Sequence, residues 1–147
     1  QIEKCINKKT VAIMIPNLLG NVPNWIEINK IAKKYNLKII EDCAESHGAS
    51  YKNKKVGSFG DVGCFSFYGN KVITSGEGGI VLTNNKNIYT KMKKIREHGY
   101  YKKNEPYTYD MLGFNFKMSN LLASIGYGQL RKNKEIIKKK KYYLNRT

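Results

Sequence analysis

The sequence predicts an α/β fold built around a mostly parallel β-sheet. Two short apolar runs, at residues 10–16 and 37–40, are typical of buried strands, and a stretch with helical periodicity lies between them. A strand–helix–strand unit of this kind joins parallel strands through a right-handed crossover. Ligands bind at the carboxyl ends of the strands in such sheets, so we expect the functional site at that edge.

Composition indicates an ordinary globular domain. The chain has 147 residues, of which 41% are hydrophobic, enough to form a core and too many for a disordered chain. No apolar run is long enough for a membrane span, and the N-terminus shows no secretory segment. The three cysteines are scattered, which predicts reduced thiols and a cytoplasmic protein, without a disulfide or zinc framework.

The net charge of +16 raises the alternative of a small basic module that binds nucleic acid through residues 132–141. Only three of the 27 basic residues are arginine, the residue that most often contacts phosphates and bases in a bidentate manner. The abundant lysine, asparagine and isoleucine instead indicate compositional drift in the coding DNA. We therefore expect no nucleic-acid partner, whereas an anionic small substrate is compatible with this charge.

The first strand is expected at Thr10–Pro16, followed by a loop to Pro23 and a helix that begins after Asn24. Asn24 is a suitable N-cap, with Glu27 at the spacing of a capping box. The apolar stripe expected to be buried on this helix consists of Trp25, Ile28, Ile31, Ala32 and Tyr35. A second buried strand at Leu37–Ile40 ends at Glu41 and Asp42.

The rest of the chain continues the alternation of strands and helices. The elements expected are a hairpin within residues 48–60, strands at 62–67 and 79–83, a helix at 86–98 that buries Ile88, Met92 and Ile95, a tyrosine-rich loop at 100–116, and a final helix from Ser119 onward. The loop tyrosines 100, 101, 107 and 109 would line a substrate site or a subunit interface. We expect His47 and His98 to be structural, with locally satisfied ring nitrogens, and no metal site.

Three residues near the predicted strand ends carry the chemistry that pyridoxal phosphate requires. Lys71 would condense with the cofactor aldehyde, Asp42 would keep the pyridine nitrogen protonated, and Ser66 would help to bind the phosphate. A glycine-rich turn at residues 76–79 follows the lysine. Each residue alone has a structural alternative: a solvated lysine, a carboxylate that caps the backbone, a serine bonded locally, and a tight turn.

Five segments together resemble the DegT/DnrJ/StrS-type sugar aminotransferases, which are fold-type I pyridoxal phosphate enzymes. The matching segments are residues 41–49, 57–61, 65–79, 96–99 and 113–119, in the family's order and spacing. The resemblance covers nearly the whole chain. It implies a partial fold-type I large domain, with three α/β/α layers and a mostly parallel sheet.

The resemblance also implies the roles of individual residues. Lys71 would hold the cofactor and shuttle a proton, Asp42 would pair with the pyridine nitrogen, and Ser66 would bind the phosphate. Glu45 would lie close to the cofactor ring, as in the perosamine synthase branch. Asn115 would reach the cofactor phosphate of the partner subunit, which implies a homodimer with shared active sites.

The resemblance implies a transaminase that transfers an amino group to a nucleotide-linked keto-deoxy sugar. By the family pattern the amino group would come from glutamate, and the product would serve surface polysaccharide or lipopolysaccharide synthesis.

Three departures accompany this resemblance. The loop at residues 15–25 is similar to that of the 3-dehydrase branch, although Lys71 argues against dehydrase chemistry, since that branch carries histidine there. Lys117 replaces the usual arginine. Residues 1–147 correspond to the central part of the large domain, without the N-terminal part and the C-terminal small domain, so an inactive truncated fragment is a further alternative.

Overall fold

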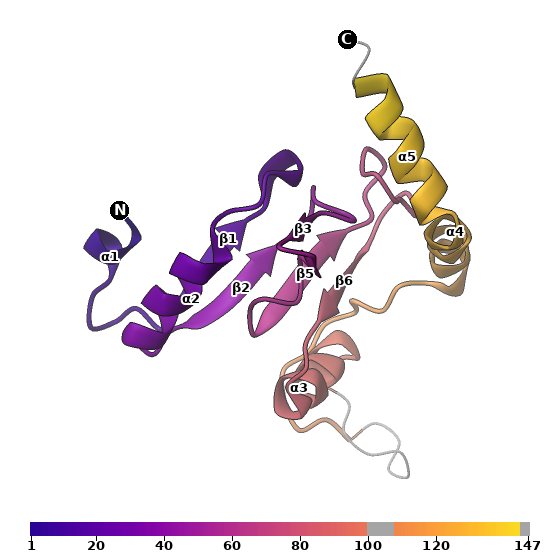
Figure 1. Cartoon of the computed structure of the whole chain (residues 1–147). Coiled ribbons are helices and arrows are strands. Elements are labelled where there is room, and N and C mark those ends of the chain that lie inside the picture. The colour runs from indigo at the N-terminus through magenta and orange to yellow at the C-terminus, as the bar shows by residue number, and fades with distance from the viewer. Residues whose placement is uncertain (100–107, 145–147) are drawn as a thin grey trace.

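The computed structural model describes residues 1–99 and 108–144, and its main feature is a four-stranded sheet (Figure 1). The strand order is β1-β2-β5-β6, where β1 is Ala12–Pro16, β2 is Lys38–Asp42, β5 is Val62–Ser66 and β6 is Gly79–Leu82. The first three strands are parallel and β6 runs antiparallel to β5. The mostly parallel α/β sheet expected from the sequence is therefore confirmed.

Helix α2 (Trp25–Lys34) forms the crossover between β1 and β2, and its N-cap is the one expected. The side-chain oxygen of Asn24 accepts hydrogen bonds from the backbone N–H groups of Ile26 (3.2 Å) and Glu27 (3.4 Å). The Glu27 carboxylate pairs with Lys30 at 2.9 Å. The buried core consists of Ile15, Trp25, Ile28, Ala32, Leu37 and Ile39.

Tyr35 does not belong to this core, contrary to expectation. It is the C-cap of α2, where the backbone leaves the helix, and the residue is 37% exposed. Its hydroxyl donates instead to the carboxylate of Glu3 (3.1 Å), which also pairs with Lys34 (2.8 Å). The apolar stripe expected on this helix includes one residue too many, because the helix ends at Lys34.

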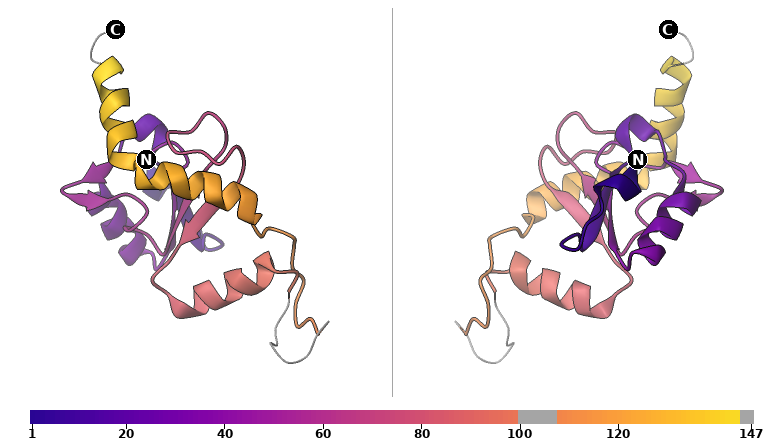
Figure 2. Two further views of the ribbon diagram at one scale, coloured as in Figure 1. Left: turned by 90° about the vertical axis from the view of Figure 1, so that its right-hand side faces the viewer. Right: turned by 90° about the vertical axis from the view of Figure 1, so that its left-hand side faces the viewer.

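The remaining elements surround the sheet. They are α1 (Ile2–Cys5), the 3-10 turn η1 (Leu18–Gly20), the hairpin β3 (Ser50–Tyr51) and β4 (Lys54–Lys55), α3 (Lys86–Arg96), α4 (Asn120–Arg131) and α5 (Asn133–Leu144). Figure 2 shows α2 and the β3–β4 hairpin on one side of the sheet and α3 on the other. No helix in the described part of the chain is long and apolar enough to cross a membrane.

The single C-terminal helix expected from Ser119 is instead two helices. Ser119, expected as the start of this helix, is the N-cap of α4 and accepts from the N–H of Leu122 (3.3 Å). The helix ends at Arg131, its C-cap Lys132 has a ψ of 12° that departs from helical geometry, and α5 then leads away from the sheet (Figure 1). The apolar periodicity is interrupted at this point, because residues 131–135 (Arg-Lys-Asn-Lys-Glu) are all polar, and the expectation of a single helix overlooked this signal.

Burial was overestimated in two places. Met14 on β1 is 64% exposed, because among the described elements only one side of that strand is covered by a helix. Ile88, Met92 and Ile95 on α3 are half-buried, not buried. Met92 and Ile95 line an open groove of about 460 Å³ between α3 and the β5–β6 strands, so this face of the helix is only partly covered. Of the tyrosine-rich loop, residues 100–107 lie outside the described part.

Candidate active site

The three parallel strands end at one edge of the sheet. The register pairs Pro16 with Asp42, and Asp42 with Cys64. Just past the strand ends, the Asn17 N–H donates to the Asp42 carbonyl (2.8 Å) and the Cys43 N–H donates to the Cys64 carbonyl (2.8 Å). Asp42 and Ser66, the last residues of adjacent strands, therefore lie at the edge where α/β proteins bind ligands.

Lys71 is largely enclosed for a lysine. Its side chain is only 16% exposed, and its ammonium lies 3.4 Å from Oε1 of Glu45. The other carboxylate oxygen of Glu45 accepts from the N–H of Leu19 (3.3 Å) in η1. Glu45 thus connects the segments that follow β1 and β2 to the lysine that follows β5. Long surface lysines are ordinarily solvated, so an enclosed amine beside a carboxylate marks a formed site.

Asp42 and Ser66 both make local hydrogen bonds. Oδ1 of Asp42 accepts from the N–H of Ala44 (3.0 Å), and the Ser66 hydroxyl oxygen accepts from the N–H of Tyr68 (3.2 Å). These contacts correspond to the structural alternatives considered for each residue. They also orient both side chains at the strand ends without using the second carboxylate oxygen of Asp42 or the serine proton.

Helix α4 supports the glycine-rich turn that follows Lys71. The side-chain oxygen of Gln129 accepts from the N–H of Thr74 (2.9 Å), and the Thr74 hydroxyl donates to the Phe67 carbonyl (2.9 Å). Gly76 and Gly78 have φ values of 86° and 105°, a backbone conformation that residues other than glycine rarely adopt. Sequence reasoning missed Gln129, because a single polar residue on a helix 55 positions away along the chain gives no local signal.

His47 lies beside this group, in an environment that differs from the one expected. Its ring is 5.5 Å from that of Phe65 and 5.9 Å from that of Phe67. Neither ring nitrogen makes a hydrogen bond of good geometry among the described residues, although the Ser66 backbone lies near enough to influence the ring. The expectation of full local satisfaction is therefore not met. Burial lowers the pKa of His47, and the nearby Lys71 and Lys140 cations lower it further, whereas the backbone of Ser66 acts in the opposite direction.

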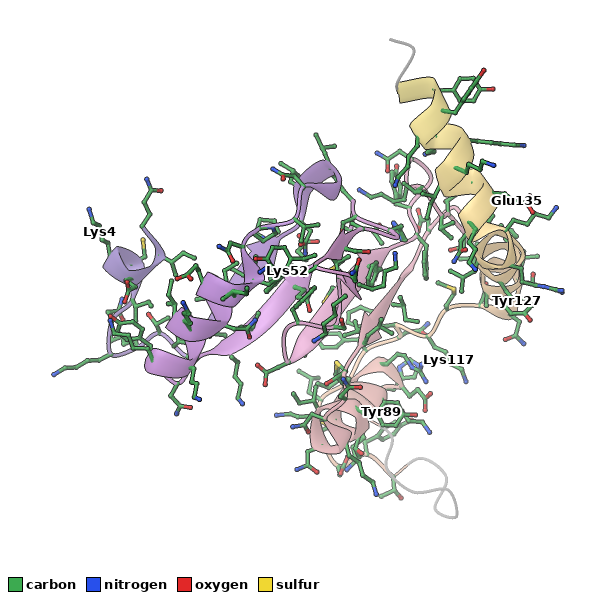
Figure 3. The ribbon with its side chains drawn as sticks, in the orientation of Figure 1. Lys4, Lys52, Tyr89, Lys117, Tyr127 and Glu135 are labelled. Atoms are coloured by element: carbon green, nitrogen blue, oxygen red, sulfur yellow. The ribbon has the colours of Figure 1, made fainter. Side chains whose placement is uncertain are left out.

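Asn115 is not part of the group formed by Asp42, Glu45, Ser66 and Lys71, which we call the Lys71 cluster. It is exposed, lies between α3 and α4, and forms an isolated antiparallel bridge with Glu97. A shallow cleft of about 240 Å³ there is lined by Arg96, Glu97, His98, Tyr109, Asn115 and Lys117. Lys117 is labelled on this segment in Figure 3. No hydrogen bond or ion pair described for these residues joins them to Asp42, Glu45, Ser66 or Lys71.

The clustered groups suit pyridoxal phosphate by their chemistry. An enclosed amine can condense with an aldehyde, and a carboxylate at the next strand end can pair with a protonated ring nitrogen. A hydroxyl followed by a turn with left-handed glycines provides donors for a phosphate. The described residues contain no group of three or more histidine, cysteine, aspartate or glutamate side chains placed to hold a metal ion.

Comparison with known proteins supports this interpretation. The sequence profile of the DegT/DnrJ/EryC1/StrS aminotransferase family matches residues 1–146. The chain is 44% identical over 140 residues to a GDP-perosamine synthase of Escherichia coli O157:H7, a match that covers 95% of this chain. It spans only 38% of the length of that synthase.

Two solved structures show the same arrangement of elements. One is Helicobacter pylori PseC, an aminotransferase involved in pseudaminic acid biosynthesis, with a TM-score of 0.86, 36% identity, and coverage of 90% of this chain and 36% of PseC. The other is the E. coli GDP-4-keto-6-deoxy-D-mannose-3-dehydratase with bound hydrated PLP. Its TM-score is 0.83, with 32% identity, and the match covers 90% of this chain and 38% of the dehydratase.

Proposed function

The chain belongs to the DegT/DnrJ/EryC1/StrS aminotransferase family. We propose that it carries the part of the active site that contains Lys71 in a pyridoxal phosphate-dependent sugar transaminase. Its sheet is part of the fold-type I aminotransferase fold. The observation that carries the proposal is the enclosed Lys71 amine, held 3.4 Å from Glu45 at the sheet edge that also bears Asp42 and Ser66. The family is PLP-dependent.

The proposed substrate is a nucleotide-linked 4-keto-6-deoxy sugar, and the proposed amino donor is glutamate. The similarity to a GDP-perosamine synthase supports this sugar class. The lysine-rich surface is suited to an anionic nucleotide diphosphate. The product would be an amino sugar for surface polysaccharide.

Each site residue has a defined role in this proposal. When bound, the cofactor supplies the electron sink for amino exchange. Lys71 would hold the cofactor and move a proton at the reacting carbon. Asp42 would hold the proton on the ring nitrogen, Ser66 would donate to the phosphate, and Glu45 would align the Lys71 amine between the loops.

The separate position of Asn115 fits a role in a dimer. An exposed side chain away from the Lys71 cluster can serve the active site of a second copy. We propose a homodimer in which Asn115 of each protomer contacts the cofactor phosphate in the site of the other. Tyr109, the one loop tyrosine within the described residues, lines the same shallow cleft as Asn115 and would border that interface.

The 3-dehydrase alternative rested on the loop at residues 15–25. In the structure this loop forms η1, and its Leu19 N–H donates to Glu45, which in turn holds Lys71. The loop thus supports a lysine-dependent site. The dehydrase alternative is not favoured.

Amino exchange with purified protein tests the proposal. Protein loaded with pyridoxal phosphate should change its visible absorption when glutamate is added and should recover after addition of a GDP-linked 4-keto-6-deoxy sugar. Lys71→Ala should abolish both changes, while Lys91→Ala, on an exposed position of α3, should leave them intact. Retained exchange in Lys71→Ala would refute the assignment.

A further inference from the structure

The side chain of Asn17 turns into the protein directly after β1. Asparagine is a favoured N-cap and Asn17 precedes η1, yet its side chain makes no capping hydrogen bond there. The residue is instead only 1% exposed. Its amide nitrogen donates to the Asp42 carbonyl (3.3 Å) and lies 3.5 Å from Sγ of Cys43.

The other end of the Asn17 amide is left unused. Its Oδ1 is buried and has no hydrogen-bond partner among the described residues. A buried polar atom without a partner costs stability, so an apolar residue of similar size would suit this position better for packing alone. The presence of an amide here therefore points to the contacts that its NH₂ group makes.

The peptide group between Asp42 and Cys43 is held from both neighbouring strands. On the β1 side, its carbonyl oxygen accepts from the backbone N–H of Asn17 (2.8 Å) and from the Asn17 side chain (3.3 Å). On the β5 side, its N–H donates to the Cys64 carbonyl (2.8 Å). Because a peptide group is planar and includes the Cα atom of Asp42, bonds at both of its polar atoms fix how the Asp42 side chain leaves the strand.

The Asn17 side chain is the part of this arrangement that depends on residue type. The main-chain bonds to Asn17 and Cys64 extend the pairing of the parallel strands, and nearly any residue could form them. The Asp42 carboxylate accepts in turn from the N–H of Ala44 (3.0 Å), which follows the same peptide. A rotation of that peptide would therefore disturb the carboxylate as well.

Asn17 also adjoins the turn that holds Glu45. The N–H of Leu19 in η1 donates to Glu45, which lies 3.4 Å from Lys71. Leu19 has a φ of 52°, a left-handed conformation that residues with a side chain adopt only where the surrounding structure enforces it. The buried Asn17 fixes the start of this turn, so one residue adjoins both acidic groups of the site.

We propose that Asn17 is a positioning residue of the active site that acts through Asp42. Its side-chain amide holds the Asp42–Cys43 peptide, and this peptide keeps the Asp42 carboxylate in one direction at the strand end. The consequence for the cofactor rests on the proposed function, whereas the hold on the peptide does not.

Amide hydrogen exchange in the cofactor-free chain tests the hold on the peptide. Asn17→Ala removes the side-chain donor without adding bulk. The N–H groups of Cys43 and Ala44 should then exchange about tenfold faster relative to the other amides of β2, as expected for the loss of one hydrogen bond. The control Asn29→Ala removes a bond of the same kind, from a side-chain amide to the Trp25 carbonyl (2.8 Å), and should leave these ratios unchanged.

The unsubstituted chain offers a second measurement that does not depend on how the variant folds. The side-chain amide protons of Asn17 should exchange about tenfold or more slowly than those of Asn29, which is exposed. Equal rates for the two asparagines would overturn the proposal. So would an equal acceleration of all β2 amides in Asn17→Ala, because Asn17 would then act only on overall stability.

Pyridoxal phosphate labelled with an NMR-active ring nitrogen extends the test to the cofactor. The chemical shift of this nitrogen reports its protonation, which a merely structural role of Asn17 would not change. In Asn17→Ala the nitrogen should lose its proton at a lower pH than in the parent chain, in the same direction as in Asp42→Asn but by less. Asn29→Ala should titrate like the parent.

The two variants separate the possible failures. A ring nitrogen that titrates normally in Asn17→Ala but is shifted in Asp42→Asn would refute the positioning role of Asn17. No shift in either variant would instead contradict the role proposed for Asp42, and the hydrogen exchange of Cys43 and Ala44 would still decide whether Asn17 holds the peptide.

Discussion

At the residue scale, the Glu45–Lys71 pair is the most informative contact in the molecule. The Lys71 side chain is only 16% exposed, and its ammonium lies 3.4 Å from the carboxylate of Glu45. Glu45 also holds the Leu19 N–H, which fixes the carboxylate between two loops. The pair therefore keeps the amine in a defined position at the strand ends, where it can meet a ligand.

Asp42→Asn tests the role of the acid at the end of β2. The asparagine oxygen can still accept from the Ala44 N–H, so the fold should persist. Loss of the anion should lower the pKa of the cofactor ring nitrogen, because the protonated form loses its opposite charge. We expect the cofactor to remain bound through Lys71 while glutamate-dependent exchange slows by about tenfold or more. Rapid-mixing spectroscopy measures both, and an unchanged exchange rate would remove Asp42 from the proposed site.

His47 should make stability depend on pH. Because its pKa in the folded protein is lowered from the ordinary 6.5, the unfolded chain binds more protons below that pH. Stability should therefore be lost as the pH falls from about 6.5, and His47→Leu should show a shallower loss between about pH 7 and pH 5. Denaturant unfolding at several pH values measures the difference.

The carboxylates whose pKa is lowered, Glu3 and Glu97, act in a separate range. Their contribution is present above the ordinary 4.5 and is lost only below it. A slope in His47→Leu equal to that of the parent chain would show that His47 does not titrate between the folded and unfolded states.

At the element scale, Glu41 connects β2 to the loop that precedes β5. Its buried carboxylate accepts from the N–H groups of Gly57 (2.6 Å), Phe59 and Gly60 (2.7 Å). Gly63 and Gly57 approach so closely that a Cβ on Gly63 would lie 2.6 Å from the Gly57 carbonyl oxygen. This loop packs against the strand that carries Ser66, so Glu41 supports the site without being part of it.

Glu41→Gln should destabilise the fold by about 3 kcal/mol, because an amide cannot accept from all three donors and places its own NH₂ against them. The control is Glu27→Gln, which removes an exposed pair with Lys30 and should cost less than about 1 kcal/mol. Urea unfolding measures both variants. Equal stability of the two proteins would show that the buried carboxylate is not the anchor of the loop.

At the scale of the whole molecule, the proposed dimer shares each active site between two copies. Lys71→Ala and Asn115→Ala should each be inactive or strongly impaired alone. When the two variants are mixed under conditions of subunit exchange, random pairing should restore about a quarter of the parent activity. Each mixed dimer would have one intact site, with Lys71 from one copy and Asn115 from the other. No recovery in demonstrated mixed dimers would contradict the sharing of sites.

The sequence predicted the parts of the fold that depend on local patterns. Apolar runs located all four strands of the main sheet, Asn24 capped α2 as expected, and the last predicted helical region began at Ser119 as expected. Patterns over a few residues could not indicate how far each face is covered, which is why the burial of Met14 and of α3 was overestimated. The break between α4 and α5 coincides with the polar run at residues 131–135, a signal that the expectation of a single helix did not use.

The candidate site was predictable only in part for the same reason. Asp42, Glu45, Ser66 and Lys71 lie close to strand ends, so topology alone brings them to one edge. Gln129 and the approach of α5 to His47 depend on helix packing over long sequence separations. The roles assigned to the site residues remain proposals.

The central claim is that Lys71 holds the cofactor, and borohydride reduction followed by peptide mass mapping tests it most directly. Protein incubated with pyridoxal phosphate and then reduced should carry the cofactor on Lys71 alone, although the chain has 24 lysines. Lys71→Ala should remain unlabelled, and Lys91→Ala should be labelled like the parent chain. Cofactor spread over many lysines, or undiminished labelling of Lys71→Ala, would contradict the assignment.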